Sequence, residues 1–457
     1  MAYPAHGGSG GPCFLGWGGA AFCALTVLAC TGEPGPAGLN GAPGDKGDPG
    51  EPGQPGAAGL GCWDLNENGA CDLVEEDVDQ DGKCSPLDCQ GHGAGGGGAG
   101  GGVAGLGYVG SESCKLCHES EYELVSNSGH PYKLTKVEGD KAPSRPFDAT
   151  TGGVPAPPLG LKWSDIGYVV GGFGWKVRYV GQDGYLVTGG ADDKTQWNFP
   201  NETIGTQGSW AAYKPGEKVP YDCGGCHTTG WVPCAVGDDT CAHQDGLEGM
   251  AGSFAEAGVR CEACHGPGSL HGAQPYLVDA KVDRSPEACG KCHRRDAVEQ
   301  IEAKGGFVDH HEQWDELFQS KKHVMRCIDC HDPHQSSKFA HPGLNPDKGI
   351  RVACISCHVG YDANQKSKLM ANLDCVACHM PRLVKSAAAV PAKHTGDIRS
   401  HMFAINPDAA APQFSEDGKQ ARPYLTLPWA CNHCHGIFAD DKPLGELAAM
   451  AKGYHAQ

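Results

Sequence analysis

The sequence predicts a mainly α-helical and irregular fold for residues 108–457, with a small β insertion at about residues 160–213 and an extended stalk in front. Three observations predict this organisation. The pattern Cys-x-x-Cys-His occurs eight times between Cys114 and His435, only 7% of all residues are aromatic, and residues 32–61 carry Gly at every third position. A chain so poor in large side chains cannot first build an ordinary core. We expect bound cofactors to form much of its interior.

The repeated pattern identifies the cofactor. In Cys-x-x-Cys-His, two thiols add to the vinyl groups of a haem and the adjacent His supplies an axial nitrogen to the iron. One copy could be a redox or zinc-binding pair, but eight copies predict eight haem c groups. We number the motifs 1 to 8 along the chain; their paired thiols are Cys114 and Cys117, Cys223 and Cys226, Cys261 and Cys264, Cys289 and Cys292, Cys327 and Cys330, Cys354 and Cys357, Cys375 and Cys378, and Cys431 and Cys434. The proximal ligands, in the same order, are His118, His227, His265, His293, His331, His358, His379 and His435.

Each iron has a second axial position, and the same region holds twelve other His residues. We expect the distal ligands among His130, His243, His271, His310, His311, His323, His334, His401 and His455. The remaining three, His341, His394 and His433, are expected to lie at the surface or behind a ligand. A haem with two His ligands suits electron transfer, whereas a haem that lacks the second ligand can bind a substrate. Twelve candidates for eight irons permit either arrangement.

The long interval between motifs 1 and 2 predicts the β insertion. Residues 166–171, 175–180 and 185–189 alternate in the manner of strands, and residues 182–184 are typical of a hairpin turn. In the second strand, Trp175, Val177 and Tyr179 share one face, while Lys176 and Arg178 share the other. We expect the insertion to cover one haem or to dock a partner.

Other segments of this region also carry predictions. Cys234 and Cys241 are expected to form a disulfide that closes a short loop, with a reactive thiol pair as the alternative. Helices are expected after motif 1, at residues 312–322, and from about Leu444 to the C-terminus.

The front of the chain is predicted to be an export segment followed by a tether. Residues 1–29 contain no charged side chain, which is typical of a signal or anchor segment. The ending Val27-Leu28-Ala29-Cys30 resembles a bacterial lipoprotein box, so we expect acylation at Cys30; a simple signal peptide or an uncleaved anchor is the alternative. Residues 30–61 form a collagen-like stalk of Gly-x-y triplets, which either winds into a trimer or acts as a stiff single-chain spacer.

Residues 62–90 are predicted to bind two calcium ions. Oxygen-bearing side chains recur at the spacing of a calcium loop in two consecutive segments. The expected ligands are Asp64, Asn66, Asn68, Asp72, Glu75, Asp77, Asp79, Asp81 and Asp88. Four Cys residues, Cys62, Cys71, Cys84 and Cys89, are expected to form two disulfides. The pair resembles thrombospondin type 3 repeats, and we expect it to stiffen the stalk rather than to sense calcium. Residues 91–107, with 11 Gly, are expected to form a flexible linker.

The charge of the chain is −19, and residues 30–107 hold 13 acids and two bases of this total. A nucleic-acid-binding protein presents a basic face, so nothing in this balance indicates a nucleic-acid partner. An acidic surface is ordinary for an exported protein and predicts no specific partner.

Four segments carry a family resemblance. They are Tyr-Val-Gly-Ser-Glu-Ser-Cys-Lys-Leu-Cys-His (108–118), Cys-Glu-Ala-Cys-His-Gly-Pro-Gly-Ser-Leu-His (261–271), Cys-His-Asp-Pro-His (330–334) and Cys-His-Met-Pro-Arg (378–382). Over most of residues 108–457 the chain resembles multihaem, here octahaem, c-type cytochromes of bacterial anaerobic and extracellular respiration. The resemblance implies haems packed in an ordered chain that relays electrons. The same superfamily includes enzymes related to hydroxylamine oxidoreductase, nitrite reductase and tetrathionate reductase. The Cys-x-x-Cys-Lys motif of the nitrite reductase catalytic haem does not occur in this sequence.

We therefore expect an electron carrier that is exported and held at the outer membrane or cell surface, or otherwise periplasmic. Its expected partners are redox proteins or extracellular acceptors, with membrane attachment through the lipid or anchor segment. The alternative is an oxidoreductase that acts on a small nitrogen or sulfur compound at one five-coordinate haem. A third possibility, haem filaments with exchanged His ligands, fits a tethered protein less well.

Overall fold

The computed structural model describes residues 107–146, 153–280, 282–295, 300–340, 348–360, 373–435, 442–452 and 454–455. All of them belong to one unit, Gly59–Gln457. The predicted signal segment, collagen-like stalk, calcium loops and nearly all of the Gly-rich linker lie outside the described residues. Of the helices in the described ranges, none is long and apolar enough to cross a membrane.

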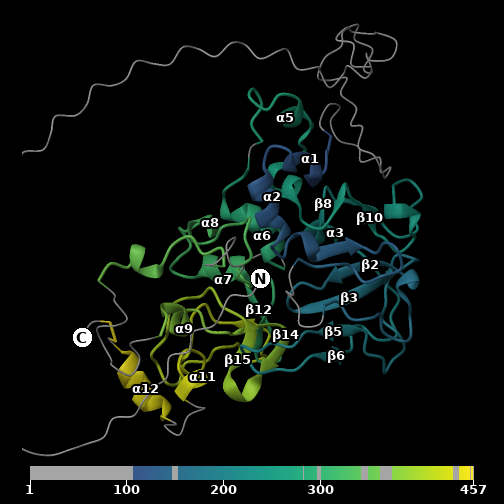
Figure 1. The fold of residues 1–457 in the computed structure, drawn as a ribbon. Coiled ribbons are helices and arrows are strands. Elements are labelled where there is room, and N and C mark those ends of the chain that lie inside the picture. Colours follow the sequence, from purple (N-terminus) through teal and green to yellow (C-terminus); the bar gives the residue numbers. More distant parts are fainter. Residues whose placement is uncertain are drawn as a thin grey trace, which may run out of the picture. The chain divides into compact units, whose positions relative to one another are not determined.

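Short helices carry most of the motifs (Figure 1). The helices are α1 (Ser111–Lys115), α2 (Glu119–Ser126), α3 (Gly224–His227), α4 (Cys261–His265), α5 (Ser269–Ala273), α6 (Pro286–His293), α7 (Gln313–Gln319), α8 (Cys327–Cys330), α9 (Cys375–His379), α10 (Leu427–Ala430), α11 (Asn432–His435) and α12 (Leu444–Ala451). A 3₁₀ turn at Cys354–Ser356 begins motif 6. A helical turn suits the motif because residues i, i+3 and i+4 lie on one face.

The predicted β insertion is present and is larger than expected. Its sheet contains β1 (Leu134–Lys136), β2 (Ile166–Gly171), β3 (Lys176–Gly181), β4 (Tyr185–Leu186), β5 (Gln196–Asn198), β6 (Ser209–Ala211) and β7 (Val219–Pro220). The order β1-β2-β3-β4-β7 is antiparallel throughout, with β5 paired to β3 and β6 paired to β5. The alternation in β3 is confirmed, since Val177 and Tyr179 are buried while Lys176 and Arg178 are only partly covered.

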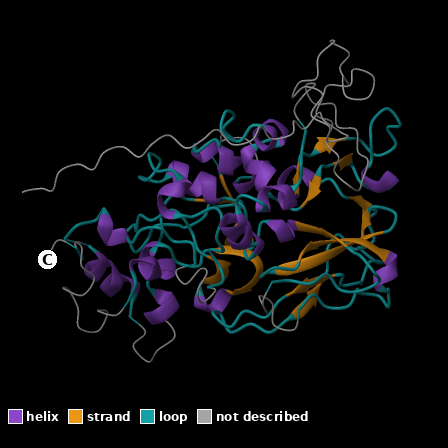
Figure 2. Ribbon diagram, turned by 45° about the horizontal axis from the view of Figure 1, so that its top comes forward, coloured by secondary structure: helices purple, strands orange, loops and turns teal. Residues whose placement is uncertain are grey.

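A second sheet was not predicted. It has the order β15-β14-β13-β12-β16 and contains β12 (Ile301–Lys304), β13 (Phe307–Asp309), β14 (Val384–Val390), β15 (Thr395–Ile398) and β16 (Gln420–Ala421). Two short pairs, β8 (Thr228–Thr229) with β11 (Glu256–Ala257) and β9 (Val232–Pro233) with β10 (Gly252–Ser253), flank motif 2. The expectation of one small β insertion is therefore corrected to a mixed fold of helices and sheets, as Figure 2 shows.

The apolar cores lie on the sheets rather than between the motif helices. One cluster packs Phe307, Leu383, Met402 and Trp429 against the second sheet, and two others pack on the two faces of the first sheet. By contrast, α2, α9 and α11 contain no buried residue. These helices thus bury little against the rest of the polypeptide, as expected for a chain that folds around bound groups.

Candidate haem-binding sites

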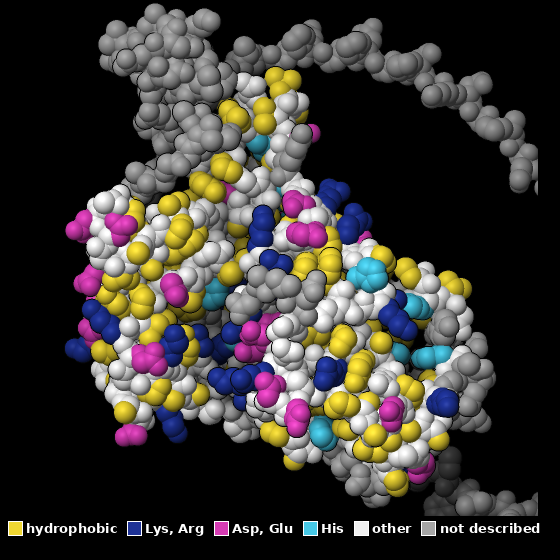
Figure 3. Space-filling model, turned by 180° about the vertical axis from the view of Figure 1, so that it is seen from behind, with side chains coloured by type: hydrophobic (Ala, Val, Ile, Leu, Met, Phe, Trp, Pro, Cys, Tyr) yellow, Lys and Arg dark blue, Asp and Glu magenta, His cyan; other side chains and the backbone are white. Residues whose placement is uncertain are grey.

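The backbone of the motifs places the thiols and the proximal His on one side of a single turn. In motifs 1, 5, 6 and 8 the amide of the His donates to the carbonyl of the first Cys, at 2.9 to 3.0 Å. Figure 3 shows His side chains at several points of the polypeptide surface. Such exposure of a mostly apolar ring is expected where a bound group completes the structure.

Four proximal His rings face a predicted distal His. The ring centroids are 6.2 Å apart for His118 and His271, 6.3 Å for His265 and His334, 6.2 Å for His331 and His401, and 5.8 Å for His379 and His455. Two imidazoles bound to opposite sides of one iron need about 2 Å for each metal–nitrogen bond and about 1 Å from each nitrogen to its ring centre, or roughly 6 Å in total. The residues present therefore fit the axial ligands of a six-coordinate haem.

Hydrogen bonds orient several of these rings. The Nδ1 atom of His271 lies 2.6 Å from the carbonyl oxygen of Val278, and that of His379 lies 2.8 Å from the oxygen of Phe403. We assign the proton to Nδ1 from this geometry. The other nitrogen, Nε2, then keeps its lone pair for a metal, which is the usual arrangement of a ligating His.

Motif 4 has two candidates for its distal position. The ring of His293 lies 6.1 Å from that of His311 and 6.4 Å from that of His130. Its own Nδ1 is 3.3 Å from Oε1 of Gln313. Only one of the two rings can complete this site. His310 contacts His311 at 4.6 Å but instead turns its Nε2 towards a group of basic side chains described below.

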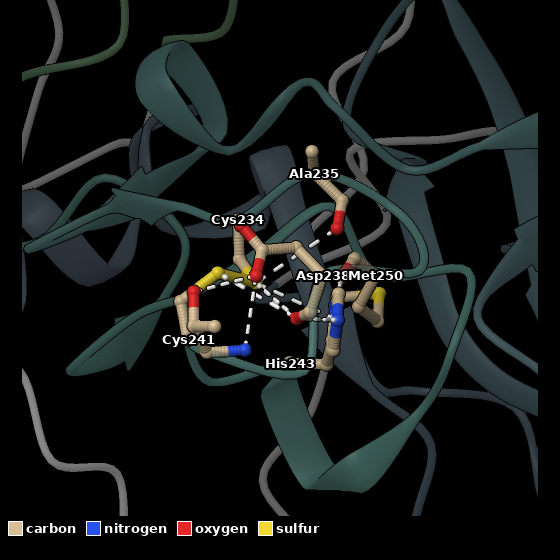
Figure 4. The surroundings of a disulfide bond; sticks show 7 residues. Cys234, Ala235, Asp238, Cys241, His243 and Met250 are labelled. Atoms are coloured by element: carbon tan, nitrogen blue, oxygen red, sulfur yellow. Dashed lines mark hydrogen bonds between the residues drawn. A yellow bond between two sulfur atoms is a disulfide. The ribbon is translucent and has the colours of Figure 1, made fainter.

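The predicted Cys234–Cys241 disulfide is present and places His243 away from this role (Figure 4). Nδ1 of His243 is 2.7 Å from the carbonyl oxygen of Met250, and Nε2 is 3.5 Å from Sγ of Cys234. Nδ1 is thus engaged by Met250, and Nε2 faces the disulfide. Within the described residues no ring contact joins His243 to a proximal His, so its position does not favour the predicted axial role.

The remaining predicted ligands have mixed surroundings. In motif 6, Nε2 of His358 lies 2.9 Å from Nζ of Lys322, while the neighbouring His323 directs Nδ1 at the carbonyl oxygen of Ser320. For His435 of motif 8, no His ring contact is found in the described part of the chain. His394 and His433, which were not expected to be ligands, contact Trp429. His341 lies outside the described residues.

The thiols show which motifs are neighbours, because they occupy the places of the thioether sulfurs. Hydrogen bonds join motifs 1 and 3 through Cys114 and Cys261, motifs 2 and 4 through Cys226 and Cys292, and motifs 4 and 5 through Cys289 and Cys327. Motifs 6 and 7 meet at Cys354 and Cys375. Cys264 and Cys289, Cys330 and Cys357, and Cys378 and Cys434 are also near enough to interact electrostatically, which places motif 3 near 4, motif 5 near 6 and motif 7 near 8. The order of contact is therefore 1-3-4-5-6-7-8, with motif 2 attached to motif 4 as a side branch.

The branch motif has a different environment from the others. No ring contact to a second His is found for His227 among the described residues, and its buried Nδ1 has no hydrogen-bond partner there. Its neighbours are basic: the cations Lys133, Lys176 and Arg178, and His310, whose pKa is lowered by burial. Such a group of cations beside a metal site favours binding of an anion.

Contacts among the basic residues fix their arrangement. Nε2 of His310 lies 3.2 Å from Nζ of Lys176 and 3.4 Å from Nη2 of Arg295. Arg178 stacks on the ring of Tyr213 at 3.5 Å. Burial, followed by the charge of Arg178, lowers the pKa of Lys176 to about 7.

Asp309 is a carboxylate that accompanies this group. Oδ1 of Asp309 is 2.9 Å from Nδ1 of His310, and Oδ2 is 3.6 Å from Nη1 of Arg295. Although burial raises it, the hydrogen bond from His310 and the charge of Arg295 lower the pKa of Asp309 to about 2. Lys133, Lys176, Arg178 and Arg295 were not predicted as site residues. The available signal was the alternation of two cations on the open face of β3.

A basic cavity of about 360 Å³ lies near motifs 7 and 8. Its lining includes Arg382, Lys393, Arg399 and His433, and no acidic residue is among the described residues that line it. Arg399 donates to the carbonyl oxygens of Val376 and Met380, both at 2.9 Å. The chemistry of this cavity suits carboxylate groups, such as the propionates of a neighbouring haem.

Comparisons with known proteins agree with this picture. No protein-family model matches the sequence. Over 138 residues, or 27% of this chain, it is 29% identical to the multiheme cytochrome MtrA of Shewanella baltica, and the match spans only 36% of that protein. The octaheme sulfite reductase MccA of Wolinella succinogenes superposes with a TM-score of 0.52 at 15% identity, covering 76% of this chain and 71% of that one.

Two further solved structures align less closely. The outer cell wall cytochrome OcwA gives a TM-score of 0.45 at 20% identity, with 74% of this chain and 86% of that chain covered. The undecaheme cytochrome from the S-layer of Carboxydothermus ferrireducens gives 0.42 at 17% identity, with 76% and 60% covered. Scores of this size support no argument about fold. The MccA superposition shows that this chain shares a fold with a multihaem cytochrome, and the MtrA match is a sequence similarity over 27% of the chain.

Proposed function

We propose that this chain is an electron carrier in which each of the eight motifs holds one haem c. The observation that carries the proposal is the set of four His pairs at the spacing of axial ligands. When bound, each haem would supply a one-electron redox group, which the proximal His and, at four motifs, the facing His would hold. The chain's own residues supply the rest: thiols that fix each group, His rings that fill the axial positions, and contacts that bring neighbouring motifs together.

The order of motif contacts supports a defined path. Motifs 1, 3, 4, 5, 6, 7 and 8 follow one another, so electrons entering at one end would pass through the others to reach the far end. Motif 1 and motif 8 are the proposed entry and exit points for redox protein partners or extracellular acceptors.

The proposed location follows from the front of the sequence. We propose that the protein is exported and held at the outer membrane or cell surface through acylated Cys30, and is otherwise periplasmic. The collagen-like triplets and the two proposed calcium ions would then space the haem-bearing region from the membrane.

A second candidate function is catalysis at motif 2. The favouring observation is that no His ring contact to His227 is found among the described residues, and that Lys133, Lys176 and Arg178 lie near it. A five-coordinate haem at this point would take a small sulfur or nitrogen oxyanion as its substrate. The superposition with a sulfite reductase is consistent with this candidate but shows only a related fold.

Low-temperature EPR of the oxidised protein, with and without sulfite, nitrite or hydroxylamine, separates the two functions. Eight low-spin haems that none of these compounds affects would support the carrier alone. One high-spin signal that shifts on addition would support catalysis at motif 2. A pyridine haemochrome assay that counts fewer than eight haems in the exported protein would contradict the proposed cofactor content.

A further inference from the structure

A single buried carboxylate organises the backbone beside motif 2. Asp397, in β15, is only 3% exposed. Its Oδ1 accepts the amide of Ser386 at 2.6 Å, and its Oδ2 accepts the amides of Ala387 at 2.7 Å and Ala388 at 2.9 Å. Three consecutive backbone donors thus converge on one carboxylate. Hydrogen bonds to a charged acceptor are stronger than those between neutral groups.

The three donors belong to an irregular part of β14. Pairing with β15 shifts register between Val384 and Ala389, so the intervening residues leave the regular ladder. In a regular strand successive amides point to opposite sides, and three of them cannot meet one acceptor. The carboxylate of Asp397 therefore holds a bulge that the ladder by itself would not maintain.

The carbonyl groups of this bulge hold the first sheet at the motif 2 site. The carbonyl oxygen of Ser386 accepts a hydrogen bond from Nζ of Lys176 at 2.9 Å. The carbonyl oxygen of Ala387 accepts one from Nδ2 of Asn198 at 3.1 Å. These contacts join residues separated by 210 and 189 positions in the sequence. The bulge is thus a connection between the two sheets.

A short relay extends the connection to the second cation. Oδ1 of Asn198 accepts a hydrogen bond from Nε2 of Gln196 at 2.7 Å. Oε1 of Gln196 in turn accepts a hydrogen bond from Nε of Arg178 at 2.7 Å. Hydrogen bonds therefore connect both cations of β3 near His227 to the bulge. Lys176 is bonded to it directly, and Arg178 is connected through the amide side chains of Gln196 and Asn198.

We propose that Asp397 is a positioning residue for an oxyanion site at motif 2, and that it acts by holding the bulge that sets the places of Lys176 and Arg178. The proposal rests on the second candidate function and names its ligand class, a small oxyanion bound beside the proximal His227. Asp397 itself does not touch the ligand. Without the charge of Asp397, the backbone amides of residues 386–388 lose a strong hydrogen-bond acceptor. The bulge then relaxes, and Lys176 and Arg178 lose the hydrogen bonds that fix their positions.

The test compares Asp397→Asn with Glu262→Gln in the full-length protein with its haems. Glu262 is a matched control because it too is 3% exposed and accepts three backbone amides, those of Val109, Gly110 and Gly268. Sulfite is titrated against the oxidised protein and followed by EPR. Cyanide, which approaches iron as neutral HCN, serves as a second probe that does not depend on the cations.

We expect Asp397→Asn to weaken sulfite binding by roughly tenfold, the effect of losing one well-placed hydrogen-bonded contact. Cyanide affinity should change by less than about threefold. Glu262→Gln should leave both affinities unchanged. In the Lys176→Met background, Asp397→Asn should add little further loss, since both changes act on the same contact.

Several outcomes would overturn the proposal. A lower melting temperature of Asp397→Asn with unchanged sulfite affinity would reduce Asp397 to a structural role, as would equal losses for sulfite and cyanide. If Asp397→Asn fails to fold, Asn198→Ala tests the same relay, and an unchanged sulfite affinity there would also count against it. A wild-type protein that binds neither probe would remove the catalytic candidate and this inference together, whereas wild-type binding with no variant effect removes only the inference.

Discussion

Whether a His can serve as an axial ligand depends on what its second ring nitrogen does. In His271 and His379, Nδ1 is hydrogen-bonded to a backbone carbonyl oxygen, so that the lone pair of Nε2 can bind iron. In His243 the carbonyl of Met250 takes Nδ1, while Nε2 faces a disulfide sulfur. Sequence position near a motif does not separate these cases, since His271, in α5, and His243 both lie between two consecutive motifs.

The first prediction contrasts these two residues. His271→Ala should convert one low-spin haem to a high-spin form because His118 then has no partner ring on the far side of the iron. His243→Ala, the control, should leave the number of low-spin haems unchanged. EPR of the two oxidised variants provides the measurement. A new high-spin signal in His243→Ala would return that residue to the set of axial ligands.

At the scale of the element, the motif helices owe part of their geometry to a missing side chain. A Cβ added to Gly224 in α3 would lie 1.9 Å from Cε3 of Trp231, whereas one added to Gly225 would lie 3.8 Å from Cδ1 of the same ring. Gly290 in α6 similarly lies under Trp314, with 2.5 Å to Cδ1. In these two motifs the first residue between the thiols must be Gly because a tryptophan packs directly on the turn.

The second prediction uses this asymmetry within one motif. Gly224→Ala should displace Trp231 and lower the free energy of unfolding by about 1–3 kcal/mol, the usual cost of overpacking. Gly225→Ala should be close to neutral, because its Cβ meets only an ordinary van der Waals contact. Thermal unfolding of the two variants compares them directly. Equal melting temperatures would show that Trp231 can move without cost.

The third prediction concerns the Cys234–Cys241 loop. The two residues are seven positions apart, and opening so short a loop should lower the free energy of unfolding by about 2–3 kcal/mol. Cys234→Ser combined with Cys241→Ser should leave the haem spectra unchanged, because no proximal His contacts the loop in the described residues. Calorimetry and optical spectra test the two parts separately. Altered haem spectra would mean that the loop supports a haem site.

The strands show which elements a sequence can reveal. β2 and β3 were predicted within one residue, because their alternating pattern and their hairpin turn are local features. β14 reads Val-Lys-Ser-Ala-Ala-Ala-Val and lacks such alternation. It is a strand because it pairs with β15, which follows it in an antiparallel hairpin and carries Asp397, and with the parallel strand β13, which is distant in sequence.

At the scale of the whole molecule, the motifs form a line with one branch. Motif 2 contacts motif 4 alone in the thiol contacts of the described residues, whereas motif 5 connects the first half of the line to the second. We therefore expect removal of motif 5, but not of motif 2, to interrupt electron transfer along the line.

The fourth prediction removes one haem at a time. Cys223→Ala with Cys226→Ala should give a protein with seven haems that still equilibrates electrons in a single fast phase after flash reduction. Cys327→Ala with Cys330→Ala should instead give two phases, because motifs 6 to 8 are then separated from the rest. Haemochrome counts verify that only one haem is lost in each variant. A single fast phase in both variants would contradict the proposed line of contacts.

The sequence by itself determined what is local, namely the Cys234–Cys241 disulfide and the strands of the first hairpin, and it predicts haem attachment at eight motifs. Each depends on residues within one turn, one loop or one strand, where spacing along the chain is spacing in space. Only the tertiary structure decided which distal His faces which proximal His, the order 1-3-4 in place of 1-2-3, and the gathering of Lys176, Arg178 and Arg295 around motif 2. These arrangements join residues far apart in the chain, and no local pattern encodes the path that brings them together.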